Sequence, residues 1–557
     1  MKTLYMAFLL CYVEHMMSEN FNEKQLIKYT KKEIINLFLK QQEDAKLLRE
    51  EMEQLNKNMS LVLEQLKVSN QARFGSSSEK IEAEIPEQLQ FCFNEAEVTI
   101  STAGEITEPV MEQVVSGHTR RIKPQGKRDA DLKGLPIRVE EHVLSDEKLQ
   151  ELFGGSYRRL PDEVYKKLDF HPATFEVVEH HVAVYCGNKN QTIVRADRPC
   201  ELLKNSIVTP SLLAAVLNTK YINSVPLYRL EQEFKRYDVN ISRQVMSNWV
   251  ITGSERYLSL LYDRMHDELY KSHVLHADET PFKVTKDGRD TMTNSYMWVY
   301  RSGKDGGGPP TILYEYQKTR KSDHPARFLK EFQGVVVCDG YQSYHKIANE
   351  RPDELKVAGC WTHARRRFAQ LCKALGKEKA KGTLAEAAVG QIAAIYHVDN
   401  SLTDLKPDEK LRERQLHVKP LVEAFFTWVK ASKHTVPEKS ETGKAFTYCV
   451  NQEQYLRTFL DDPAVPLDNN TAEIAIRSFC VGKHNWHLID TINGAKASAI
   501  AYSIAETAKA NNLKPYNYFK YILEEIPKHM DEKNTKFLED LLPWSKNLPD
   551  ECKKQSN

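Results

Sequence analysis

The segment from Lys271 to Trp361 constrains the fold more than any other part of this 557-residue chain. Its run Val335–Val337 is continuously apolar, which is typical of a strand buried on both faces of a parallel sheet. Alternating residues around Trp298 and Tyr314 are typical of two further strands. The remaining elements expected are strands at 273–277 and 355–360, and helices that begin near Ser322 and Tyr341. The predicted order is three strands, a helix, a strand, a helix and a strand.

This order of elements is that of a ribonuclease H-like domain, in which the first and fourth strands are neighbours. Asp278 is expected at the end of the first strand, and Asp339 at the end of the fourth. Two carboxylates at adjacent strand ends can hold two Mg²⁺ ions about 3.5 to 4 Å apart, an arrangement that activates a water or a 3′-hydroxyl in phosphodiester chemistry. A purely structural role is the alternative, because turns often begin with aspartate.

A third acidic ligand is expected from a later helix. Asp468 or Asn469 can cap a helix on which Glu473 and Arg477 lie four residues apart, on one face. Glu473 follows Asp339 by 134 residues, a gap long enough for an inserted subdomain with a helical pattern. Gly482 is expected to end the helix, which would place Lys483 beyond it.

Three parts of the sequence favour contact with a nucleic acid, and two of them are runs of basic residues. Eight Lys/Arg face one Glu between residues 356 and 381, where aromatic side chains lie among them. The candidate DNA-binding residues in that run are His363, Arg365, Arg366 and Arg367. A basic arm at 118–133 adds Arg120 and Arg121. For either run, a solvated charged surface is the alternative.

A helix pair supplies the third candidate DNA contact. Pro226 begins the first helix, residues 238–240 form a turn, and Ser242 caps a second short helix. This spacing suits a helix-turn-helix whose second helix enters a major groove with Arg243 and Gln244 near its start. Helix pairs without any DNA contact are also common.

The N-terminal region predicts self-association. Apolar residues follow a heptad from Ile34 to Leu66, which favours a coiled coil and therefore a homo-oligomer; an amphipathic helix packed on its own domain is the alternative. The apolar run Leu4–Val13 has ten residues, about half of what spans a bilayer. It has no small-x-small cleavage site, and Met16 or Met17 could be the true start. We expect no membrane partner and a cytoplasmic protein, associated with the nucleoid when bound to DNA.

Composition excludes several other classes. The chain has 78 Lys+Arg and 77 Asp+Glu, so its net charge says nothing about a nucleic-acid partner. Its ten cysteines include no CxxC pair, which favours reduced thiols over a disulfide scaffold. P-loop and Rossmann glycine patterns, a Ser-His-Asp arrangement and Cys-His zinc spacing are missing from the sequence.

The motifs together resemble the transposases of the IS66 type of bacterial insertion sequences, a DDE family with a ribonuclease H-like catalytic core. The resemblance covers nearly the whole chain. It rests on Arg73–Lys80, Phe93–Glu97, Lys220–Tyr221, Pro226–Arg229, Leu275–Pro281, Asp339–Tyr341, Cys360–Arg366, Asp468–Asn470 with Glu473, Gly482–Lys483 with Asn485–Trp486, and Leu541–Trp544. Each motif is modest by itself, but chance does not account for all of them in this order.

The resemblance implies that Asp278, Asp339 and Glu473 are the metal ligands, and that Arg477 and Lys483 lie where DNA phosphates pass. It also implies a zinc-ribbon-like module at 116–200. Only Cys186 and Cys200 remain in that span, so a four-thiolate zinc site is impossible and no zinc is expected. The expected cofactor is Mg²⁺ or Mn²⁺, as two ions.

The predicted fold class is a multidomain chain: an α/β ribonuclease H-like core with a helical insertion, an N-terminal coiled coil and helical DNA-binding modules. The expected divisions are a coiled coil at 1–80, an acidic linker at 81–115, a basic arm with a degenerate zinc-ribbon-like β module at 116–200, a helix-turn-helix-like region at 201–262, the first part of the core at 263–362, the helical insertion at 363–462, the second part of the core at 463–515 and a C-terminal tail at 516–557.

The predicted function is that of a DDE transposase, which binds the ends of an insertion sequence, cleaves strands there and joins the 3′-hydroxyls to target DNA. Its expected partners are double-stranded DNA, other copies of itself and accessory proteins of the same element. Two alternatives stay open. One is a ribonuclease H-like nuclease that cuts without joining, and the other is a non-catalytic coiled-coil DNA-binding protein from a decayed element.

Overall fold

In the computed structural model the chain divides into two compact units. The first contains residues 1–102, 363–404 and 413–453, and the second contains residues 103–362, 405–412 and 454–557. The structure describes residues 174–186, 193–195 and 201–555, apart from 291–292, 304–306 and 533, together with isolated positions between 32 and 50 and at 147. The predicted coiled coil therefore lies almost entirely outside the described residues, and the acidic linker and the basic arm lie wholly outside them.

A six-stranded mixed sheet forms the centre of the second unit. Its strands are β3 (Val274–Lys286), β4 (Asn294–Ser302), β5 (Ile312–Gln317), β6 (Gly334–Cys338), β7 (Leu355–Gly359) and β8 (Leu488–Thr491). The order is β5-β4-β3-β6-β7, with β3, β4 and β5 antiparallel and β3, β6 and β7 parallel. Helices α11 (Asp323–Phe328) and α12 (Gln342–Glu350) separate β5, β6 and β7 along the chain, so the predicted order of elements is confirmed.

Strand β3 is much longer than predicted. Its parallel pairing with β6 covers only 274–276, where the sequence placed the strand, but its antiparallel pairing with β4 continues to Lys283. Beyond that point β3 pairs with β8, a strand that was not predicted. Asp278 therefore does not end a strand; it lies where β3 has left β6 and is still paired with β4.

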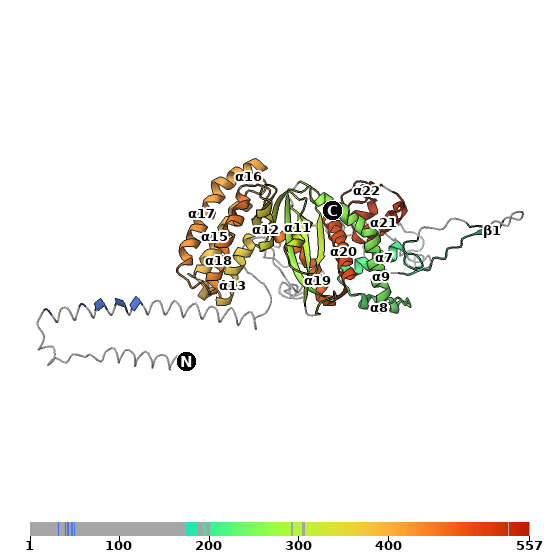
Figure 1. The fold of residues 1–557 in the computed structure, drawn as a ribbon, viewed down its shortest axis with the longest axis horizontal. Coiled ribbons are helices and arrows are strands. Elements are labelled where there is room, and N and C mark those ends of the chain that lie inside the picture. The colour runs from blue at the N-terminus through green and yellow to red at the C-terminus, as the bar shows by residue number, and fades with distance from the viewer. Residues whose placement is uncertain are drawn as a thin grey trace, which may run out of the picture. The chain divides into compact units, whose positions relative to one another are not determined.

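Each face of the sheet is covered by helices (Figure 1). On one face Phe282 packs edge-on against Phe479 of α19 (Asn470–Trp486), and Tyr314 contacts Tyr502 of α20 (Ile492–Ala510). On the other face Tyr300 stacks on Phe328 of α11, with 3.7 Å between ring centroids. Because successive residues of a strand point to opposite faces, the even-numbered residues of β3 face α19 and the odd-numbered ones face α11 and α12.

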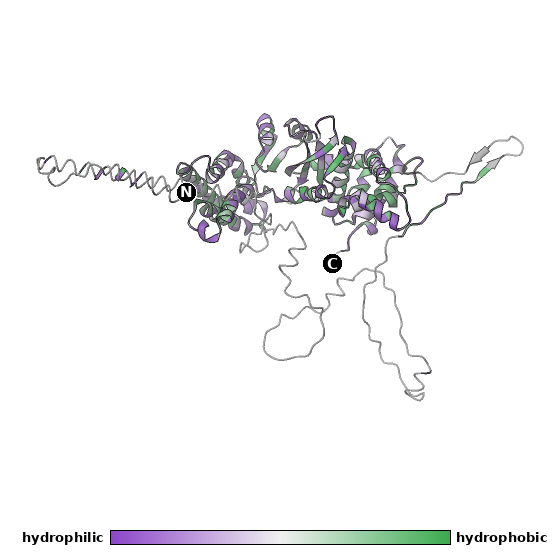
Figure 2. Ribbon diagram, turned by 90° about the horizontal axis from the view of Figure 1, so that it is seen from below, coloured by the Kyte–Doolittle hydropathy of each residue, from purple (hydrophilic) through white to green (hydrophobic). Residues whose placement is uncertain are grey.

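Burial follows the hydropathy of the strands. Val335, Val336 and Val337 are all buried, as predicted for a strand covered on both faces. Figure 2 shows hydrophobic colour along the strands of the sheet and hydrophilic colour on the outer turns of the helices.

Helices before and after the sheet complete the core of this unit. Those before it are α7 (Pro210–Leu217), α8 (Leu227–Arg236), α9 (Arg243–Gly253) and α10 (Ser259–Leu269). Those after α20 are α21 (Pro515–Glu525) and α22 (Leu538–Leu541). Tyr518, Phe519 and Ile522 of α21 are fully buried in the same core as α7. The described part of the expected C-terminal tail is therefore packed structure. Before these helices in the sequence, β1 (Val184–Cys186) pairs antiparallel with β2 (Ile193–Arg195).

Helices fill the sequence between β7 and α19, as predicted for the insertion. They are α13 (Trp361–Leu375), α14 (Lys377–Ala380), α15 (Leu384–Asn400), α16 (Pro407–Glu413), α17 (Lys419–Lys433) and α18 (Glu441–Arg457). Within the helical unit a buried ion pair joins Arg414 Nε to Asp399 Oδ1 at 2.7 Å. Among the helices that the structure describes, none combines the length and the apolar character needed to cross a bilayer.

Gly334 gives a test of how the parallel pair β3–β6 is assembled. Its φ is +151°, and an added Cβ would lie 2.2 Å from the carbonyl oxygen of His273. We expect Gly334→Ala to destabilise the protein by about 2 to 4 kcal/mol, because strain and overpacking act together. Gly390→Ala is the control, since an added Cβ there meets nothing within 4 Å and alanine favours the α15 helix by about 0.5 to 1 kcal/mol. Urea unfolding followed by circular dichroism compares the two; equal midpoints would contradict the prediction.

Candidate active site

Three carboxylates come from the central strands of the sheet and from a helix that packs on it. Asp278 lies in β3, Asp339 directly follows β6, and Glu473 lies in the first turn of α19. Because Asp278 is an even-numbered residue of β3, its side chain is on the face that α19 covers. A carboxylate oxygen of Glu473 also lies within 4.8 Å of Sγ of Cys360, the residue that follows β7.

The electrostatic environment of Asp278 includes the other two acids. Burial raises the pKa of Asp278 well above its ordinary value, and the negative charges of Glu279, Asp339 and Glu473 raise it further. Like charges held together disfavour ionisation of each other, so a cluster of this kind is stabilised by a cation. Carboxylate oxygens are the hard donors that Mg²⁺ and Mn²⁺ prefer, and the chemistry of this donor set fits such an ion.

Backbone amides orient the two aspartates in the same way. The N–H of Glu279 donates to Asp278 Oδ1 at 2.8 Å, and the N–H of Tyr341 donates to Asp339 Oδ1 at 3.1 Å. Each aspartate thus has one oxygen fixed by the chain that follows it.

Asn469 connects α19 to the sheet. Its side-chain nitrogen donates to the carbonyl of Ala277 at 2.8 Å, and its Oδ1 lies 3.0 Å from Nδ1 of His276. Burial lowers the pKa of His276 to about 4, so the ring is neutral and its Nδ1–H can donate to Asn469. Asn469 is the N-cap residue of α19, one of the two predicted positions, but its side chain makes no capping hydrogen bond and its amide is used by β3 instead. Asp468 Oδ1 accepts from the N–H of Asn470 at 3.1 Å.

Glu279 is a fourth acid of the site, and the sequence analysis did not select it. Its side chain is only 3% exposed and accepts a hydrogen bond from Arg320 Nε at 2.7 Å. Burial raises its pKa to about 7, and the charge of Asp339 contributes while Arg320 opposes the shift. The available signal was its position next to Asp278, but an acid beside another acid is common on any exposed turn.

Of the two cations predicted near Glu473, Arg477 lies at its predicted place on α19 and Lys483 does not lie where it was predicted. Arg477 lies one turn after Glu473, as predicted, and is partly buried. Gly482 does not end the helix, so the position predicted for Lys483 is wrong: α19 continues to Trp486. Gly482 is needed for close packing, because an added Cβ would lie 2.2 Å from the Trp486 ring. Lys483 Nζ donates to Thr280 Oγ1 at 3.3 Å and to the carbonyl of Pro281 at 2.9 Å.

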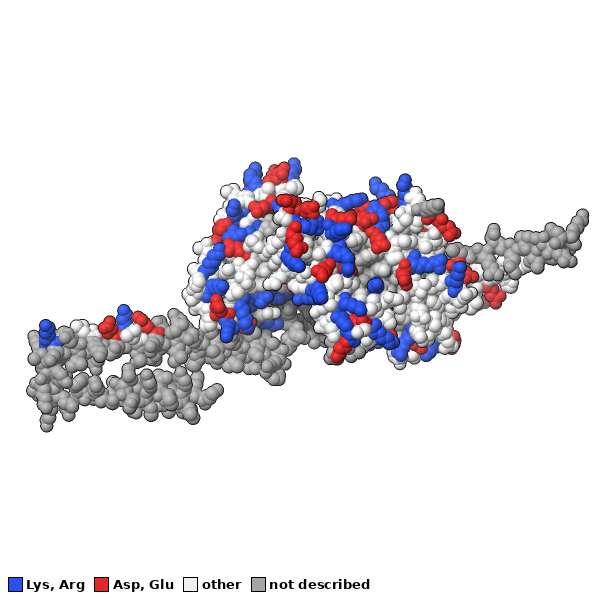
Figure 3. Space-filling view, viewed as in Figure 1, with Lys and Arg blue, Asp and Glu red and all other residues white. Residues whose placement is uncertain are grey.

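The predicted cations of the basic run lie on α13, in the helical unit. His363, Arg365 and Arg366 are partly buried, whereas Arg367 is exposed and its guanidinium lies 4.4 Å from the ring centroid of Tyr448. Basic and acidic side chains are interspersed on the face of the molecule shown in Figure 3. Charge alone therefore does not mark one DNA-binding surface on that face.

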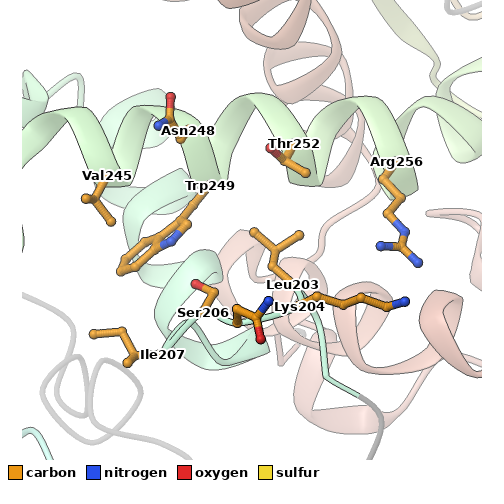
Figure 4. Close-up of a pocket in the computed structure, with 10 residues that line it drawn as sticks. Leu203, Lys204, Ser206, Ile207, Val245, Asn248, Trp249, Thr252 and Arg256 are labelled. Carbon is orange, nitrogen blue, oxygen red and sulfur yellow. The ribbon is translucent and has the colours of Figure 1, made fainter.

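The predicted helix pair is present as α8 and α9. Ser242 caps α9 by accepting from the N–H of Val245 at 3.3 Å, as predicted. Arg243 and Gln244 are exposed at the start of α9. Further along α9 one face lines a pocket of about 490 Å³ (Figure 4). The pocket is lined by Leu203, Lys204, Asn205, Ser206, Ile207, Val245, Asn248, Trp249, Thr252 and Arg256.

Some residues named in the sequence analysis lie outside the described residues. Arg120 and Arg121 belong to the basic arm, of which nothing is described, and Cys200 of the candidate zinc module is also outside. His180 and His181 are exposed. Among the described residues, no disulfide is formed by Cys338, Cys360, Cys372, Cys449, Cys480 or Cys552.

The fold is that of a mixed α/β protein. Its candidate site consists of carboxylates from the central strands and from a later helix. The model of the IS66 family of transposases matches residues 205–497, and the model of the IS66 C-terminal element matches residues 503–544. The chain belongs to the IS66 family of transposases. Membership of this family implies a protein that binds DNA.

Relatives of similar length are found in Sinorhizobium fredii (strain NBRC 101917 / NGR234). The uncharacterized protein y4qI is 26% identical over 494 residues, which cover 86% of this chain and 88% of y4qI. The uncharacterized protein y4hP is 25% identical over 485 residues, covering 84% and 86% of the two chains. The uncharacterized protein y4jD is 26% identical over 400 residues, covering 70% and 76%.

Asn469 gives a test of how the third acid is positioned. Asn469→Ala would leave His276 and the carbonyl of Ala277 without their partner in a buried place, at a cost of about 1 to 3 kcal/mol for each group. We expect a lower unfolding midpoint in urea. Asn511→Ala is a matched control, since it also removes a side-chain amide with two hydrogen-bond partners, here the carbonyls of Pro310 and Thr507, but in a partly buried place. An Asn469 variant as stable as the Asn511 variant would contradict the prediction.

Proposed function

We propose that this protein is a DDE transposase with a ribonuclease H-like catalytic core, in which Asp278, Asp339 and Glu473 hold two divalent metal ions. The single observation that carries the proposal is the convergence of these acids from three separate parts of the chain. The strand order β5-β4-β3-β6-β7 supports it, because it brings β3 and β6 together as that core requires. Family membership supports the reaction class.

The chain's own residues prepare the site for phosphodiester chemistry. When bound, two Mg²⁺ or Mn²⁺ ions would activate a water or a 3′-hydroxyl and stabilise the leaving oxygen. Oδ1 of Asp278 and Oδ1 of Asp339 each accept a hydrogen bond from a backbone amide, which orients both carboxylates. The packing of α19 on β3 supplies Glu473 from the same side of the sheet. The reaction would cut strands at the element's ends and then join the 3′-hydroxyls to target DNA.

Other parts of the chain are proposed to bind DNA and further copies of the protein. Arg243 and Gln244 begin the exposed end of α9, and His363, Arg365, Arg366 and Arg367 follow the start of α13. Arg120, Arg121, Arg477 and Lys483 complete the proposed DNA contacts. The N-terminal heptads are proposed to make the protein an oligomer.

A metal-dependent nuclease that cuts without joining is the second candidate function, because the acid cluster serves both reactions. A strand-transfer assay with precut element ends separates the two, since only a transposase joins those ends to a second duplex. A decayed, non-catalytic DNA-binding protein would fail both this assay and a cleavage assay with divalent metal.

We expect Asp278→Asn, Asp339→Asn and Glu473→Gln each to reduce cleavage to the level seen without metal. Each change keeps the shape of the side chain but removes a charge that would neutralise the metal. Binding to duplex DNA that carries the element's end should be largely unchanged, as measured by fluorescence anisotropy. A variant that still cleaves would remove its residue from the proposed ligand set.

We expect Lys483→Ala to weaken DNA binding and to reduce the slope of log affinity against log salt by about one, as for the loss of one phosphate contact. The side chain now donates to β3, so urea unfolding of the same variant is needed as a second measurement. Lys286→Ala is the control: this exposed lysine of β3 pairs with Asp490 at 2.7 Å. An unchanged salt slope in the Lys483 variant would assign that lysine to stability alone.

A further inference from the structure

Arg320 connects the two chain segments that carry the aspartates of the site. It lies between β5 and α11, and its side chain is 42% exposed. Its Nε and Nη2 both donate to Glu279 Oε1, and its guanidinium lies 4.0 Å from the ring centroid of Tyr341. The hydroxyl of Tyr341 in turn donates to the carbonyl of Arg320. One arginine is therefore bonded to β3 and to the segment that follows β6.

The two residues that Arg320 contacts are the ones that orient the aspartates. Glu279 donates its backbone N–H to Asp278 Oδ1, and Tyr341 donates its backbone N–H to Asp339 Oδ1. The same arginine thus acts on both carboxylates through one intermediate residue on each side.

The pleat of β3 places the side chains of Glu279 and Asp278 on opposite faces of the sheet. Successive side chains of a strand point to opposite faces, so Asp278 points toward α19 and Glu279 points toward α12. The aromatic contacts agree, because Trp298, the partner of Glu279 in β4, packs against Tyr341 and Tyr344. Glu279 therefore faces away from Glu473, which makes it unsuited to join the three acids as a ligand.

We propose that Arg320 is a positioning residue, which fixes the separation of Asp278 and Asp339 through Glu279 and Tyr341 and so sets the affinity of the site for divalent metal. The inference rests on the proposed function, because it concerns the same acids. Partners that orient metal ligands typically change metal affinity by about 10- to 100-fold when they are removed. Arg320 does not need to contact the metal or the DNA for this effect.

The test measures Mn²⁺ binding to the full chain by isothermal titration calorimetry in the absence of DNA. We expect Arg320→Ala to weaken Mn²⁺ binding about 10- to 100-fold, while its affinity for duplex DNA without metal is unchanged. Arg289→Ala is the matched control and should leave Mn²⁺ binding unchanged. Arg289 also bonds a buried acid, Asp287, but does so about 25 Å further along the chain of β3.

A double variant separates position from charge. Removing Arg320 alone leaves the Glu279 carboxylate without its cation, whereas Glu279→Gln with Arg320→Ala removes both charges. If Arg320 fixes geometry, the double variant still binds Mn²⁺ weakly. Recovery of the wild-type affinity in the double variant would overturn the proposal and assign Arg320 to charge compensation. Unchanged Mn²⁺ affinity in Arg320→Ala, with weaker DNA binding and a shallower salt slope, would make it a phosphate contact and also overturn the proposal.

Two further variants decide the question if Arg320→Ala does not fold. Arg320→Lys keeps the charge but cannot reproduce both the two-nitrogen contact and the stacking on Tyr341, so we expect only partial recovery of Mn²⁺ affinity. Tyr341→Phe keeps the ring and removes the bond to the carbonyl of Arg320, so a smaller loss is expected. Wild-type affinity in both variants would overturn the proposal. A wild-type protein that binds no Mn²⁺ would overturn the proposed function itself, which is a distinct result.

Discussion

The mutual repulsion of carboxylates is the constraint on which the rest of the site depends. Burial raises the pKa of Asp278, and the negative charges of Glu279, Asp339 and Glu473 raise it further. Such a cluster persists only where the surrounding structure holds it in place. Here the covered sheet supplies the support: β3 and β6 are buried strands, and α19 is attached to β3 through aromatic packing and through Asn469.

The two aspartates are held by one means and Glu473 by another. The two aspartates accept from the backbone N–H groups that follow them, which depend on the local path of the chain. Glu473 depends on a contact between distant parts of the chain, because Asn469 reaches His276 and Ala277 across 193 and 192 residues of sequence. Loss of the packing between α19 and β3 would therefore change the position of Glu473 more than the orientation of the aspartates.

The sequence predicted the order of strands and helices in the sheet because those elements have local signals. Continuous apolar residues marked β6, alternation marked β4 and β5, and Ser242 marked the start of α9. The length of β3 could not be predicted, because it depends on pairing with β8, which lies about 200 residues away in sequence. Gly482 was misjudged for a similar reason: its space is filled by Trp486 and Tyr502, and only the packed structure shows that a glycine is required there.

Neighbouring residues of one strand account for the division of roles around Asp278. The pleat sends Asp278 to the face of α19 and Glu279 to the face of α12, so one acid joins the cluster while the next is paired with an arginine. A shift of one residue in the register of β3 would exchange these two side chains and place the Arg320 pair where the metal ligands should meet. Register is therefore a functional property of β3. Its long antiparallel pairing with β4, which extends through nine successive partners from Leu275 to Lys283, is what fixes it.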